Sequence, residues 1–177
     1  MSAIKIVGLD HFLQSLKDQC FTEAGKKEEA RQKQDLANIL DQIIKENEID
    51  LIAEEGKLDG SCLGSLLAKE NNVSHIDITM PVPEREKRGV RTPDYDNNDA
   101  SRRAAYQIFE QYMFERLGAA DWHKALVMVG RRHLGGLTNL LEAAGHEVAT
   151  YDVNDYDWYK GIPQEGADGI VGYFRED

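Results

Sequence analysis

The chain has 177 residues, and its 32 acidic and 21 basic residues give a formal net charge of −11 at pH 7. One domain of this length buries a sizeable core, and an acidic chain is a poor partner for nucleic acid or an anionic membrane. No run approaches the roughly 18 apolar residues of a membrane span, and the first residues read as a strand rather than a secretory signal.

The first half of the chain alternates short apolar runs with helical periodicity. Residues 4–7 have the character of a buried strand, and an amphipathic helix is predicted over about 28–48, where apolar residues recur every three or four positions. A second strand follows at 49–53. Leucine spacing then predicts a helix around 61–70, and a third strand is predicted at 75–79.

The second half opens with a long polar connection, residues 81–99, which contains three prolines. Connections of this length within a compact domain are usually functional or mobile. A long helix is predicted to begin at Asp99 or Ser101, either of which is a suitable cap. A fourth strand at 125–129, a leucine-rich helix and a fifth strand at 147–150 complete the pattern.

Strands separated by helix-length connections pair in parallel through right-handed crossovers. The sequence therefore predicts an α/β fold, with an open, mainly parallel sheet of about five strands and helices on both faces. We expect residues 1–150 to form a single domain and 151–177 to be an acidic, aromatic extension packed on it. Residues 147–177 alone carry a net charge of −6. Tyrosine and tryptophan in this extension are also typical of subunit contacts, which leaves a homodimer as one interpretation.

Two predicted strands end in the same short pattern. Gly8 is followed by His11, and Gly130 by His133, each with the spacing G-x-x-H. Chance expects about 0.4 such spacings in a chain of this composition, so two at strand ends are informative. Glycine lets the backbone turn sharply at the end of the strand. Ligands of parallel sheets bind at the edge formed by the carboxyl ends of the strands, where these motifs lie. Two imidazoles there can hold a divalent metal ion or act as acid and base.

A carboxylate from the same edge would complete this site. Glu54 and Glu55 end the second predicted strand, and since strand side chains alternate, only one of them points into the site. We expect Glu54 to join His11 and His133 as the catalytic or metal-binding group, and Glu55 to be solvated or to contact substrate. The remaining histidines and Cys62 are predicted to be structural or solvated.

Arginines are the candidate substrate-binding residues. Guanidinium groups clamp carboxylate or phosphate oxygens, so Arg85 and Arg131 are predicted to bind substrate, with the loop 81–99 as a lid or else a solvated connection. Despite the net charge, the mouth of the sheet is predicted to be locally positive because five arginines gather there: Arg85, Arg88, Arg91, Arg131 and Arg132. A small anionic ligand fits this pattern, and a nucleic-acid polymer does not.

The paired G-x-x-H motifs with a strand-end glutamate between them resemble the TraB/Tiki-like superfamily, over about residues 4–150. That superfamily includes erythromycin-esterase-like hydrolases, metal-dependent peptidases and a haem-binding branch. The resemblance is closest to small uncharacterised bacterial proteins that share a series of positions, which here are Gly8 and His11, Glu54 or Glu55, Glu84 and Arg85, and Gly130 and His133.

Together these observations predict a small hydrolase with a His/His/Glu site, working with or without a divalent metal ion. Cys20 and Cys62 lack metal-type spacing, which favours a reduced, cytoplasmic setting over a disulfide between them. The alternatives are a non-catalytic protein that binds a nucleotide, haem or another small anion, and a protein-interaction module that uses the acidic extension.

Overall fold

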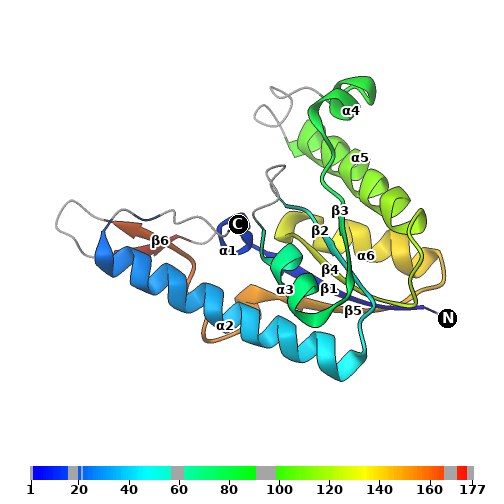
Figure 1. Ribbon diagram of the computed structural model, residues 1–177. Helices are drawn as coiled ribbons and strands as arrows, with labels where there is room; N and C mark the ends of the chain where they lie inside the picture. The colour runs from blue at the N-terminus through cyan, green and yellow to red at the C-terminus, as the bar shows by residue number, and fades with distance from the viewer. Residues whose placement is uncertain are drawn as a thin grey trace.

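The computed structural model describes residues 2–15, 20, 22–56, 62–90, 99–165 and 171–174. Its centre is a five-stranded sheet in which neighbouring strands run parallel, in the order β3-β2-β4-β1-β5 (Figure 1). Each strand contains most of one predicted apolar run, so the sheet confirms the predicted α/β class. The strands are β1 (Ala3–Leu9), β2 (Leu51–Glu54), β3 (Ser74–Asp77), β4 (Lys124–Gly130) and β5 (Glu147–Asp152).

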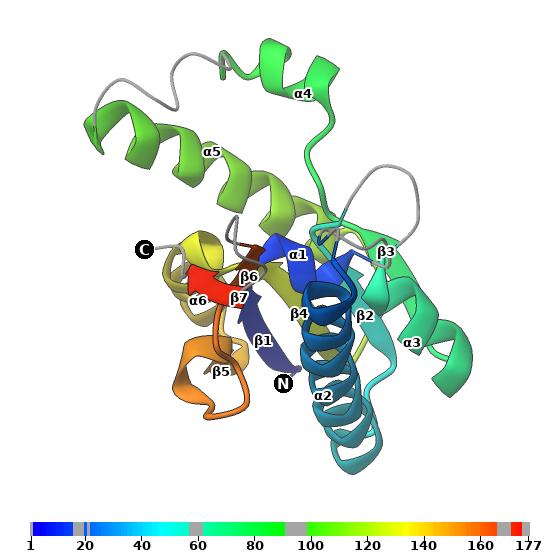
Figure 2. The ribbon, with the colours of Figure 1, turned by 90° about the vertical axis from the view of Figure 1, so that its left-hand side faces the viewer.

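Helices cover both faces of the sheet, which confirms the predicted three layers (Figure 1, Figure 2). The long helices α2 (Glu23–Asn47) and α3 (Leu63–Asn71) share one buried apolar cluster with the sheet. The other cluster lies under α5 (Asp99–Gly118) and α6 (Leu134–Ala143). Shorter turns follow the strand ends: α1 (His11–Gln14), α4 (Val82–Lys87) and 3-10 turns at Arg131–His133 and Val153–Asp155.

The alternation of side chains along β2 decides toward which face of the sheet the residues at its end point. Leu51 and Ala53 pack in the cluster under α5 and α6, whereas Ile52 packs in the cluster under α2 and α3. Because successive strand residues point to opposite faces, Glu54 lies with Ile52 and Glu55 lies on the α5 and α6 side. The backbone there is held on both sides, since Glu55 N–H donates to Met128 O and Ile78 N–H donates to Glu54 O, at 2.8 and 3.0 Å.

Helix α2 is long because its sequence supplies a cap at each end and one apolar face. Thr22 caps it by accepting a hydrogen bond from Gly25 N–H at 3.2 Å, and the chain leaves it through Glu48 at a left-handed φ of 52°. Its inward face is the run Leu36, Leu40 and Ile44, one residue per turn, each buried on the sheet. Burying one such side chain stabilises the fold by about 1.5–3 kcal/mol.

The polar connection predicted at 81–99 contains a short helix. Pro81 precedes α4 and Pro83 lies in its first turn, where a missing backbone donor costs nothing. Val90 then buries its side chain in the cluster under α5. Residues 91–98, and with them Arg91, lie outside the described residues.

The acidic extension begins after β5, which runs to Asp152. Val153 and Tyr159 are buried in the cluster under α2. The side chain of Gln32 on α2 accepts a hydrogen bond from Lys160 N–H and donates one to Gly161 O, both at 3.2 Å. Strands β6 (Ile162–Glu165) and β7 (Val171–Phe174) then pair antiparallel beside α2. In the part of the chain that the structure describes, no helix is both long and apolar enough to cross a membrane.

Candidate active site

A cavity of about 370 Å³ lies at the carboxyl edge of the sheet, over the ends of β1, β2 and β4. Both predicted histidines line it, together with Glu55 and two aromatic residues, Tyr106 and Phe109. Three arginines also contribute: Arg85, Arg131 and Arg132. A second cavity of about 310 Å³ shares His11, Glu55 and Arg85 with the first, so the two cavities adjoin.

Glu55 is the carboxylate at the centre of this edge. One of its oxygens accepts a hydrogen bond from Gly130 N–H at 2.9 Å, and the other lies 3.6 Å from Nε2 of His133. Its side chain is only 13% exposed. The structure therefore corrects the expectation that Glu54 accompanies the histidines, because the alternation along β2 turns Glu55 toward the cavity and Glu54 to the opposite face.

His133 is held between two carboxylates. Its Nδ1 lies 3.3 Å from a carboxylate oxygen of Glu110 on α5, while Nε2 faces Glu55. The rings of Tyr106 and Phe109 meet the imidazole edge-on. Burial by itself lowers the pKa of His133, but the hydrogen bond to Glu110 and the charge of Glu55 outweigh it, and the pKa lies above its ordinary value. The two carboxylates thus favour the protonated, proton-donating form of His133.

Glu110 is a site residue that sequence reasoning missed. It lies 23 positions before His133 and belongs to no strand-end motif. Helical periodicity places Glu110 beside the buried residues Ala105, Phe109 and Met113. An acid at such a flanking position is expected to be exposed to solvent. The one available signal is Gly136 in α6, since a Cβ at that position would overlap the Glu110 carboxylate.

Replacing Glu110 by glutamine is expected to lower the pKa of His133 and to reduce the pH dependence of stability. Because the folded pKa of His133 is raised, its contribution to stability is fully present below the unfolded pKa of about 6.5 and is lost as pH rises through the folded pKa. Histidine NMR titration and urea unfolding at several pH values measure both effects. Glu142→Gln, an exposed carboxylate on α6, is the control, and an unchanged His133 pKa in Glu110→Gln would contradict the assignment.

His11, by contrast, is exposed at the start of α1. Its Nδ1 lies 3.0 Å from Oε1 of Gln14, whose own NH₂ group donates to the backbone carbonyl of Glu55 at 3.0 Å. The Oε1 atom of Gln14 can only accept a hydrogen bond, so Nδ1 of His11 is the donor in this contact and Nε2 is the ring nitrogen that faces away from Gln14. A Cβ on Gly130 would lie 3.1 Å from Nε2 of His11 and 3.3 Å from Glu55, so this glycine lets the two groups approach the strand end.

The arginines of the edge differ in how they are held. Arg131 pairs with the buried Asp10 at 3.2 Å, and Arg132 donates to the hydroxyl of Tyr106 at 3.2 Å. Arg85 donates through Nε to Met80 O, and its guanidinium lies over the ring of Phe109 at 5.2 Å. Among the described residues no carboxylate pairs with Arg85, so it is the arginine best placed to meet an anion.

Arg88, also predicted at this mouth, has another role. It does not line the cavity and instead pairs with Glu84 and Glu115 at 2.8 and 2.7 Å, which ties α4 to α5. The positive mouth of the sheet is therefore built from Arg85, Arg131 and Arg132, as far as the described residues go.

Glu54 lies in a different group, beneath α3. It is fully buried, and its carboxylate lies 3.5 Å from Nε2 of His75 and close to Cys62. The predicted metal set of His11, His133 and Glu54 is thus not assembled. Burial, and then the neighbouring Glu54 carboxylate, raise the pKa of the Cys62 thiol to about 12, so this cysteine is a poor nucleophile.

Comparison of the chain with models of protein families found no match, and comparisons with curated proteins and with solved structures found none either. The resemblance to the TraB/Tiki-like superfamily therefore stays a prediction that depends on the residues named above.

Proposed function

We propose that the chain is a small hydrolase that cleaves anionic esters at the cavity over the sheet edge, with His11, His133 and Glu55 as its central residues. The observation that carries this proposal is the position of Glu55, which accepts Gly130 N–H and faces His133 in the cavity that His11 and Arg85 also line. In this proposal His11 is the base, His133 is the buried acid and Arg85 is the positive charge, and all three line one volume.

The proposed reaction is an acid–base hydrolysis. Nε2 of His11 takes a proton from water as the water oxygen bonds to the carbonyl carbon or phosphorus of the ester. The bond to the leaving oxygen breaks, and protonated His133 gives that oxygen its proton. Glu110 supports the charge on His133, and Glu55 fixes the ring from the other side. General acid–base catalysis of this kind contributes about 10²–10⁴-fold to a rate.

The negative charge of the substrate is the second element of the proposal. Arg131 is already engaged by Asp10, whereas Arg85 lines the cavity and has no carboxylate partner among the described residues. The planar guanidinium group of an arginine can bind a carboxylate or phosphate through two parallel hydrogen bonds. Binding of a small anion without turnover is the second candidate function, because the same three arginines support it.

The first test is hydrolysis of chromogenic phosphate and carboxylate esters by the wild-type chain and by Arg85 variants. We expect Arg85→Ala to raise KM at least about tenfold for the anionic ester that is cleaved, as loss of a charge-assisted bond of 1.5–3 kcal/mol implies. Arg85→Lys restores only part of the loss, since lysine keeps the charge without the fork.

Lys87→Ala is the matched control, because this side chain lies on the same helix and is 77% exposed. Its KM is expected to equal that of the wild type. No cleavage of any ester, combined with calorimetric binding of phosphate or a small carboxylate that Arg85→Ala abolishes, would replace hydrolysis by the binding function. The absence of both cleavage and binding would refute both candidate functions.

A further inference from the structure

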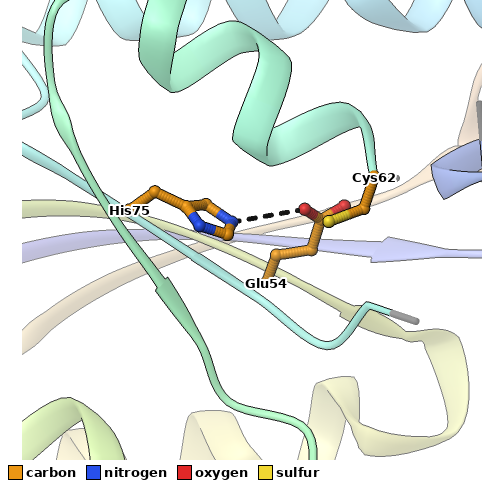
Figure 3. Close-up of side chains that lie close together, drawn as sticks. All are labelled: Glu54, Cys62 and His75. Carbon is orange, nitrogen blue, oxygen red and sulfur yellow. Dashed lines mark ion pairs between the residues drawn. The ribbon is translucent and has the colours of Figure 1, made fainter. Parts of the chain in front are cut away.

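The side chains of Glu54, Cys62 and His75 converge from three elements beneath α3 (Figure 3). Glu54 ends β2, Cys62 immediately precedes α3, and His75 belongs to β3. Each offers a ligand atom, and these three atoms all lie within 4.8 Å of one another. Among the described residues this is the one group of three or more such side chains, and it is separate from the cavity histidines His11 and His133.

Burial without hydrogen bonds distinguishes this group from an ordinary polar cluster. Glu54 is 0% exposed, and neither of its carboxylate oxygens has a hydrogen-bond partner in the described part of the chain. Nε2 of His75, which faces it, has none there either. An ionised carboxylate removed from water costs several kcal/mol unless a counter-charge meets it. A bound cation supplies that charge.

The backbone makes room for this convergence. A Cβ on Gly64 would lie 2.6 Å from a carboxylate oxygen of Glu54, and a Cβ on Gly56 would lie 3.1 Å from the sulfur of Cys62. Glycine at both positions therefore lets the acid and the thiol press against the turns that surround them. The cavity of about 310 Å³ reaches Gly56 and Cys62, so solvent approaches the group from that side.

We propose that Glu54, Cys62 and His75 form a zinc-binding site with a fourth position open toward this cavity. Sulfur, nitrogen and oxygen donors together are the ligand set that zinc takes in proteins, and three protein ligands with one open position are typical of catalytic zinc. Two ligand atoms about 2 Å from a tetrahedral ion lie about 3.3 Å apart. The 3.5 Å between Glu54 and His75 matches that separation.

The experiment loads the metal-free full-length chain with zinc, measures affinity by competition with a chromophoric chelator, and repeats the loading with cobalt. We expect about one zinc ion per chain and a thiolate-to-cobalt absorption band. Cys62→Ser and His75→Gln are expected to lower the affinity by at least about 100-fold, more than the loss of an outer-shell partner does. Cys20→Ser, at the other buried cysteine, is expected to keep both the affinity and the band.

The wild-type chain alone decides the proposal if a variant fails to fold. Absence of stoichiometric zinc, or of the cobalt band, in the folded wild-type chain overturns it, and so does a folded Cys62→Ser chain that keeps wild-type affinity. His11→Ala is expected to bind zinc normally, because His11 is no part of the group. Failure of the zinc site therefore leaves the hydrolase proposal standing, and failure of ester cleavage leaves the zinc site standing.

Discussion

Replacing His11 by alanine is expected to lower kcat/KM for ester hydrolysis by about 10²–10⁴-fold, the usual contribution of a general base. The side chain is exposed and is oriented by Gln14, so its removal takes away the basic nitrogen at little cost to stability. The loss is expected in kcat rather than KM, because the base acts on water and not on the bound anion. Steady-state kinetics with the anionic ester that the wild-type chain cleaves measures it.

His123→Ala is the control for this substitution. That side chain is 89% exposed, far from the sheet edge in the register of β4, and its loss is expected to leave kcat unchanged.

Gln14→Ala tests the positioning of His11: we expect a smaller drop in kcat together with a shifted pH profile, since the ring loses the partner that fixes its tautomer. A His11→Ala chain with wild-type kcat would exclude His11 as the base.

Replacing Gly136 by alanine is expected to destabilise the fold by about 1–3 kcal/mol, the cost of breaking a buried hydrogen bond, here the one between Glu110 and His133. A Cβ there would overlap the Glu110 carboxylate, which must then move away from His133. The displaced acid no longer supports the charge on the imidazole, so the pKa of His133 is expected to fall as well. Urea unfolding and histidine NMR titration follow the two effects.

The neighbouring glycine gives a control with the opposite sign. A Cβ on Gly135 meets nothing within 4 Å, and alanine is the better helix former by up to about 1 kcal/mol. Gly135→Ala is therefore expected to leave stability equal or slightly higher, with an unchanged His133 pKa. Equal destabilisation by both substitutions would show that α6 rejects any side chain there and that Glu110 plays no special part.

The sheet was predictable because its signals are local. Apolar runs such as 125–129 are long enough to identify a buried strand, and the stripe Leu36, Leu40 and Ile44 identifies a helix face. Among the missed elements, α1 and α4 have four and six residues, too few for a periodic pattern. They form because the chain turns at the strand ends, a consequence of tertiary structure.

The site was predictable only in part, for a similar reason. The G-x-x-H spacing draws attention to His11 and His133, and both line one cavity because each follows a strand of the same parallel sheet. The choice between Glu54 and Glu55 needs the register of β2 against β4, which pairs Glu54 with Met128 and is set by the whole sheet. Glu110 and the group around Glu54 depend on contacts between elements far apart in the chain.

Glu54 and Glu55 share a single peptide unit that is hydrogen-bonded on both sides of the strand, to Met128 and to Ile78. Deletion of one residue from β2 before Glu54 would move Glu55 into the place of Glu54 and leave the cavity without its carboxylate, and an insertion there would leave the group beneath α3 without its own. A chain that uses two consecutive acids in this way has little freedom to vary the length of β2. The surface helices retain that freedom. Homologous chains are therefore expected to keep the spacing between β2 and these two acids.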